Sequence, residues 1–107
     1  MTSFSCTLQL NSITAPQFID ITDTVEHTVS QSGIVSGIVT VFSKHTTAAI
    51  RVIENEPLLI NDLTKMLEHL APRDSYYQHN DMGIRTVNVG EKEPPNGHSH
   101  CQQFLLA

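Results

Sequence analysis

The chain has 107 residues, which is enough for one small domain. Eleven Asp and Glu residues outweigh six Lys and Arg, the net charge is −5, and no basic run exists, so a nucleic-acid partner is disfavoured. The N-terminus has no signal-peptide pattern, and no apolar run approaches the roughly 20 residues of a membrane span. We therefore expect a cytoplasmic protein without a membrane partner. Cys6 and Cys101 fit no metal spacing, and we expect two buried thiols.

The first half of the chain indicates strands around one helix. Strict alternation over residues 4–10 is typical of a half-buried strand, and residues 18–21 suit a second short one. Asp23 followed by Glu26 fits a capping box, and Gly33 suits a helix stop, which predicts a helix over 23–32. β-branched residues over 37–42 and 46–53 predict two more strands.

The second half indicates two helices separated by an irregular segment. Pro57 suits a first helical turn, and leucines and a methionine at helical spacing predict a helix from there to Ala71, before Pro72. Residues 73–96 are irregular, apart from a short extended piece over 84–89. Asn96 suits the cap of a last helix through Leu106, although residues 101–106 also suit a strand.

Histidines in polar surroundings are the first candidates for chemistry, because imidazole is both a common metal ligand and a proton carrier near neutral pH. They are His45, His79, His98 and His100. His98 and His100 would share a face in a strand and could bind one metal. In a helix they would point about 200° apart and could not.

Two further groups lie near His45. Thr46 and Thr47 offer hydroxyls that can hold a phosphate or carboxylate, although two threonines also suit a plain strand. Glu54 and Glu56 flank Asn55 just before a helix. They suit capping and dipole compensation, or alternatively a general base or a metal-bridging carboxylate.

The ordered set of these motifs resembles the YjbQ family of secondary thiamine-phosphate synthases. The resemblance runs over essentially the whole chain. It is carried by His45-Thr46-Thr47-Ala48, Glu54-Asn55, Leu70-Ala71-Pro72, Tyr77-Gln78-His79-Asn80 and Asn96-Gly97-His98-Ser99-His100.

The resemblance implies an α+β fold with a mixed or antiparallel β-sheet sandwich and two or three helices, assembled as a homotrimer. It also implies a site in which His45, His79 and His100 bind a divalent metal, zinc or magnesium, with His98 as a secondary candidate. Glu54 and Asn55 match the family's glutamate–asparagine pair, whereas Ile53 replaces an asparagine common in relatives. Family members continue with further strands, so we expect residues 1–107 to form one domain that lacks them.

Three functions are compatible with these residues. The resemblance favours an enzyme that joins a hydroxymethylpyrimidine diphosphate to a thiazole phosphate, with phosphate contacts from Thr46, Thr47 and Asn55 and proton transfer or ligand orientation by Glu54. A metal-dependent hydrolase with Glu54 as its base is the second function. The third is a trimeric module that binds a small anion without turnover.

Overall fold

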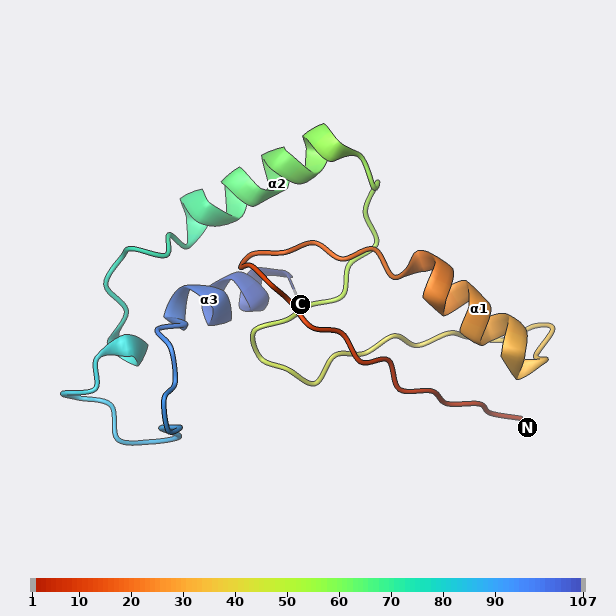
Figure 1. The fold of residues 1–107 in the computed structure, drawn as a ribbon, viewed down its shortest axis with the longest axis horizontal. Coiled ribbons are helices and arrows are strands. Elements are labelled where there is room, and N and C mark those ends of the chain that lie inside the picture. The colour runs from red at the N-terminus through yellow and green to blue at the C-terminus, as the bar shows by residue number, and fades with distance from the viewer. Residues whose placement is uncertain (1, 107) are drawn as a thin grey trace. The chain divides into compact units, whose positions relative to one another are not determined.

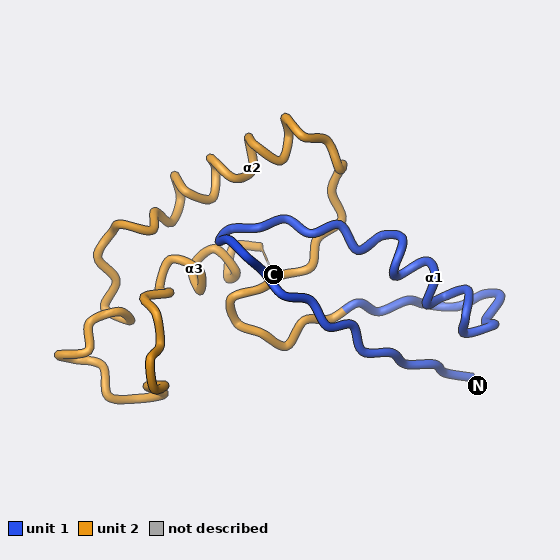
Figure 2. The backbone as a smooth tube through the Cα atoms, in the orientation of Figure 1, with its two compact units in different colours: residues 1–41 blue, residues 42–107 orange. Residues whose placement is uncertain are grey.

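A computed structural model describes residues 2–106 of the chain. The chain divides into two compact units, residues 1–41 and residues 42–107 (Figure 2). The first unit holds helix α1, Thr22–Ser32, and the second holds helix α2, Pro57–Leu70, a 3₁₀ turn η1, Gln78–Asn80, and helix α3, Gly97–Leu106 (Figure 1). No helix in the described part is long and apolar enough to cross a bilayer.

The expected β-sheet sandwich is wrong, because residues 2–106 contain three α-helices and no β-strand. None of the segments that were expected to be strands takes part in a β-ladder; they are residues 4–10, 18–21, 37–42, 46–53 and 84–89. A strand exists where its N–H and C=O groups pair with a neighbouring strand. Between the helices, backbone hydrogen bonds such as Ala48 N to His45 O and Ile84 N to Asp81 O join positions within four residues of each other, in turns and caps.

The three predicted helices are confirmed, with corrections at their caps. Helix α1 ends where Gly33 adopts the left-handed conformation, φ 69°, and donates its N–H to Ser30. The expected capping box does not form, because the helix begins at Thr22, and it is Asp20 Oδ1 that accepts from Thr22 N at 2.9 Å.

Helix α2 begins at Pro57, as predicted. The Glu56 carboxylate accepts hydrogen bonds from the backbone N–H groups of Leu58 and Leu59, which satisfies two of the donors that a helix start leaves free. The capping role considered for the residues before Pro57 therefore belongs to Glu56.

Buried apolar packing within the described residues is confined to the C-terminal end of α2, where Leu67 and Ala71 are 3% and 4% exposed. Large apolar side chains elsewhere, such as Val52 and Phe104, are exposed. Both cysteines are also exposed, so the expectation of two buried thiols is wrong.

The amide of Gln102 connects α3 to the end of α2. Gln102 is 6% exposed, and its Nε2 donates to the carbonyl oxygens of Ala71 at 3.2 Å and Leu67 at 3.4 Å. The Leu67 carbonyl already accepts from the backbone N–H of Ala71 at 2.9 Å, so Gln102 adds a second hydrogen bond there and supplies a partner to the buried carbonyl of Ala71.

Replacing Gln102 by alanine is expected to lower the free energy of unfolding by about 1–3 kcal/mol, because it removes the side-chain partner of the buried Ala71 carbonyl. Chemical denaturation followed by circular dichroism measures this change. Gln103→Ala removes the same amide from the adjacent, less buried position and serves as the control. Equal losses in the two variants would contradict the bridging role of Gln102.

Candidate functional site

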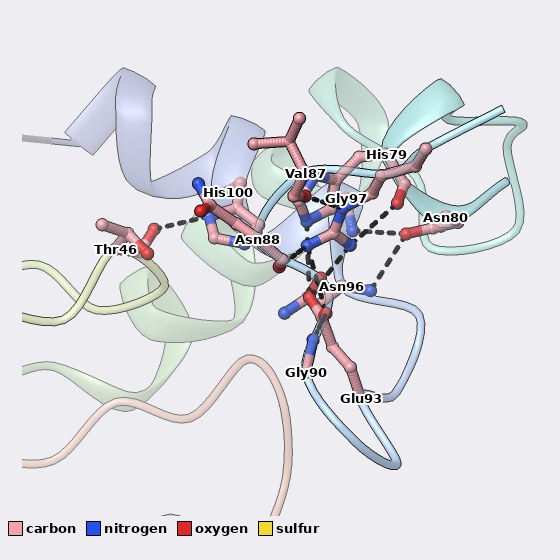
Figure 3. Close-up of polar contacts among 11 residues, drawn as sticks. Thr46, His79, Asn80, Val87, Asn88, Gly90, Glu93, Asn96, Gly97 and His100 are labelled. Carbon is pink, nitrogen blue, oxygen red and sulfur yellow. Dashed lines mark hydrogen bonds and ion pairs between the residues drawn. The ribbon is translucent and has the colours of Figure 1, made fainter. Parts of the chain in front are cut away.

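The turn η1 lies against the first turn of α3, and this contact builds the site. Asn80 Oδ1 accepts from the backbone N–H of Gly97 at 2.9 Å and of Asn96 at 3.1 Å (Figure 3). Asn96 occupies the N-cap position as predicted, because its carbonyl accepts from His100 N at 3.1 Å, but its own side-chain oxygen has no partner. The side-chain oxygen that serves this helix start is that of Asn80.

A glycine at position 97 permits this close approach. A Cβ atom on Gly97 would lie 2.7 Å from Tyr77 Cβ and 2.9 Å from Tyr77 Cγ, closer than such atoms pack. The contact brings His79, in η1, next to His100, in α3. Their ring centroids are 4.7 Å apart, and the rings meet edge to face at 75°.

The orientation of His100 is set by a backbone carbonyl. His100 Nδ1 lies 3.1 Å from the carbonyl oxygen of Thr46. A carbonyl oxygen can only accept, so Nδ1 carries the proton and donates it. In the neutral ring Nε2 then keeps its lone pair, which is the arrangement that a metal-binding histidine needs.

His79 offers an unpaired ring nitrogen at the same place. Its Nε2 is closed off from solvent, has no hydrogen-bond partner and lies 3.6 Å from Glu93 Oε1. One ligand atom each from His79, Glu93 and His100 lies within 4.8 Å of the other two. Two imidazoles and a carboxylate are a donor set that fits a divalent transition metal, and the orphaned nitrogen of His79 would gain a partner from such an ion.

Arg85 forms hydrogen bonds and an ion pair with the loop that carries Glu93. Its Nη1 donates to Glu93 Oε1 and to the carbonyl oxygen of His79, both at 3.1 Å, and its Nη2 lies 3.1 Å from Glu93 Oε2. Its remaining donors reach the carbonyl oxygens of Val87 and Asn88. Sequence analysis missed Arg85 and Glu93, which stand eight residues apart in the irregular segment 73–96. The sole local signal is that opposite charges flank turn-forming Asn88 and Gly90.

These side chains surround a pocket of about 370 Å³ in the second unit. The residues that line it are His45, Thr46, Thr47, His79, Arg85, Asn88, Glu93, Asn96 and His100. The structure thus brings the three expected histidines and both threonines to one pocket. Their roles there remain predictions.

Three other candidates lie apart from the pocket. Glu54 and Asn55 are exposed and are not among the residues that line it. His98 is 5% exposed and faces the ring of Tyr77, with centroids 6.5 Å apart. Because α3 is a helix from Gly97, His98 and His100 diverge, which rules out the strand alternative for this pair.

The pKa of the Glu93 carboxyl is lowered by the hydrogen bond from Arg85 and then by the N–H of Gly90. A carboxyl with a depressed folded-state pKa stabilises the fold above its unfolded value of 4.5, and this contribution is lost as the pH falls through the folded pKa. In chelator-treated protein, we expect the Glu93→Gln variant to show a smaller drop of the unfolding temperature between pH 7 and 3 than the wild type.

Thermal unfolding by circular dichroism at stepped pH measures this difference. Glu91→Gln, which removes an exposed carboxylate of the same loop, is the control and is expected to keep the wild-type profile. A Glu93→Gln profile parallel to that of the wild type would contradict the stabilising role of the pair.

Comparison with known proteins identifies the family of the chain. The sequence model of the family described as UPF0047 protein YjbQ-like matches residues 6–107. A UPF0047 protein of Methanothermobacter thermautotrophicus is 42% identical over 80 residues, which are 69% of this chain and 56% of the relative. UPF0047 protein MJ1081 of Methanocaldococcus jannaschii is 32% identical over 79 residues, 69% of this chain and 57% of the relative.

A bacterial relative, UPF0047 protein YugU of Bacillus subtilis, is 34% identical over 67 residues, 62% of this chain and 51% of the relative. The chain therefore spans about half the length of the curated relatives it matches. No solved structure shows a significant match. The family resemblance predicted from the sequence is confirmed, and the chain belongs to the UPF0047 YjbQ-like family.

Proposed function

We propose that the pocket is a divalent-metal centre that acts on a small phosphorylated substrate. The observation that carries this proposal is the convergence of His79, Glu93 and His100, whose ligand atoms lie within 4.8 Å of one another beside the pocket. Two nitrogen ligands and one carboxylate favour zinc over magnesium, which prefers oxygen ligands. When bound, the ion would offset and polarise the charge of phosphate oxygens.

His45 takes a substrate-side role in this proposal. It lines the pocket but is not part of the cluster of ligand atoms, so Glu93 replaces it in the metal set expected from the family resemblance. Together with the Thr46 and Thr47 hydroxyls, the imidazole of His45 forms a polar wall that suits phosphate oxygens. Glu54 is not proposed as a base, because it does not line the pocket.

Charge balance supports the need for a metal. Arg85 is the one guanidinium among the residues that line the pocket, and its donors are directed to Glu93 and to backbone carbonyls. The negative charge of the Glu93 carboxylate offsets the positive charge of Arg85. A phosphate dianion would therefore meet little net positive charge here unless a cation is bound.

The specific reaction that we propose is the joining of a hydroxymethylpyrimidine diphosphate to a thiazole phosphate. A bond forms between the thiazole nitrogen and the exocyclic carbon of the pyrimidine, and the carbon–oxygen bond to the diphosphate breaks. Pyrophosphate leaves with the bonding electrons. The family resemblance supports this choice, and the names of the relatives assign no activity.

Metal analysis and a product assay test the proposal. We expect about one zinc per chain and formation of thiamine phosphate from the two precursors, both lost in His79→Ala. Hydrolysis of simple phosphate esters without the joining reaction would favour a metal-dependent hydrolase. Tight phosphate binding by a protein without stoichiometric metal would contradict the proposal and favour a non-catalytic anion-binding module.

A further inference from the structure

We propose that Arg85 is a positioning residue of the metal centre, which holds Glu93 so that a single carboxylate oxygen is presented to the ion. This inference rests on the proposed function, because it concerns the ligand set His79, Glu93 and His100. It assigns to Arg85 neither substrate contact nor proton transfer.

The guanidinium of Arg85 is engaged on every nitrogen by groups of its own loop and of η1. Arginine carries five N–H groups, one on Nε and two on each Nη. Four of them donate hydrogen bonds, to the carbonyl oxygens of His79, Val87 and Asn88 and to Glu93 Oε1. Nη2 also forms an ion pair with Glu93 Oε2 at 3.1 Å. The side chain of Arg85 is 10% exposed. A phosphate could bind Arg85 only by displacing one of these partners.

The two oxygens of Glu93 are not equivalent. Oε2 forms an ion pair with Arg85 Nη2 at 3.1 Å and accepts a hydrogen bond from the backbone N–H of Gly90 at 3.2 Å. Oε1 accepts from Arg85 Nη1 and lies 3.6 Å from His79 Nε2, on the side of the imidazole cluster. Oε1 therefore keeps a lone pair directed to the imidazoles that can bind a metal ion, whereas Oε2 is occupied by Arg85 and Gly90. Glu93 would bind the ion through Oε1 alone.

Arg85 also fixes the other end of the ligand set. The same Nη1 that reaches Glu93 Oε1 donates to the carbonyl oxygen of His79 at 3.1 Å. One rigid, planar group thus ties the backbone of one proposed ligand to the carboxylate of another. Groups that orient metal ligands in this way commonly contribute 10–100-fold to metal affinity, by order of magnitude.

Zinc affinity of Arg85 variants tests this role. Arg85→Met is expected to weaken zinc binding by about 10–100-fold, measured by competition with a chromophoric chelator. Arg85→Lys keeps the positive charge but lacks the planar fork, so we expect it to recover little of the loss. Arg51→Met is the matched control. Arg51 is exposed, its Nη1 donates to the carbonyl oxygen of Leu106 in the same unit, and neither residue lines the pocket.

A double-mutant cycle separates positioning from a purely structural role. If Arg85 acts through Glu93, Arg85→Met or Arg85→Lys should cost far less zinc affinity in a Glu93→Gln background than in the wild type. A role confined to folding of the loop would give losses that add. Circular dichroism identifies any variant that fails to fold. If Arg85→Met does not fold, the cycle can still be measured with Arg85→Lys.

The outcomes distinguish this inference from the proposed function. A wild-type protein that binds no stoichiometric metal overturns both. Three results would overturn the role of Arg85 and leave the proposed function intact, provided that the wild type binds stoichiometric zinc. They are full zinc affinity in Arg85→Met, full recovery of affinity in Arg85→Lys, and additive losses in the cycle. Visible absorption of the cobalt-substituted protein adds a check, because altered ligand geometry in Arg85→Lys should shift its bands relative to the wild type.

Discussion

Replacing His79 by alanine is expected to weaken zinc binding by about 100-fold or more, because a direct metal ligand contributes at least as much affinity as the groups that orient it. Glu93→Gln is expected to have an effect of similar size. His45→Ala is expected to keep zinc affinity near that of the wild type, because the cluster of converging ligand atoms does not include His45. Isothermal titration calorimetry with zinc measures all three variants.

His69→Ala is the matched control, because it removes an exposed imidazole of α2 that does not line the pocket. The comparison of His45 with Glu93 decides between two ligand sets. If His45→Ala loses zinc binding while Glu93→Gln retains it, the ion is held by three histidines, as the family resemblance implies. The assignment of Glu93 as a ligand, and with it the role of Arg85, would then be wrong.

The helices could be predicted from the sequence because the features that define them are local. Pro57 at the start of α2 and Gly33 at the end of α1 act within one turn of the backbone, and both lie where their residue types predict. Asn96 was correctly placed at the start of α3, but the side-chain acceptor at this helix start could not be predicted, for the converse reason. Its acceptor, Asn80, lies 17 residues before Gly97, and no sequence rule joins positions so far apart.

The strands were predicted wrongly because an alternating pattern describes one face of a segment but not its partner. Residues 4–10 and 37–42 have the composition of strands, yet a ladder also needs a second backbone in register. No described residue provides one for these segments. Apolar periodicity alone therefore overstated the β content of this chain.

The site was predicted in part. His79 and His100 were predicted because a histidine in a polar segment is a candidate metal ligand or proton carrier wherever it lies in the sequence. Arg85 and Glu93 were not, because an ion pair within an irregular loop has no characteristic sequence spacing. Glu54 was given a chemical role from its place before a helix, whereas the neighbouring Glu56 uses the same place to cap α2.

Gly97→Ala is the variant with the largest expected effect on the architecture of the site. Inside a helix, alanine is favoured over glycine by about 1 kcal/mol, so local propensity alone predicts stabilisation. The added Cβ would lie 2.7 Å from Tyr77 Cβ and 3.1 Å from Asn80 Oδ1. Tyr77 has little freedom to withdraw, because the affected atoms adjoin its backbone and its hydroxyl donates to Pro72 O at 2.7 Å.

We therefore expect the overlap to outweigh propensity and to lower the free energy of unfolding by about 1–3 kcal/mol. Zinc affinity should fall as well, because the displaced contact holds His79 against His100. Denaturation and zinc titration of Gly97→Ala measure the two effects, with Gly37→Ala as control, since a Cβ there would meet Ile34 at an ordinary 3.5 Å. A Gly97→Ala protein that is more stable than the wild type and keeps its zinc affinity would show that η1 and α3 are not held together by this close approach.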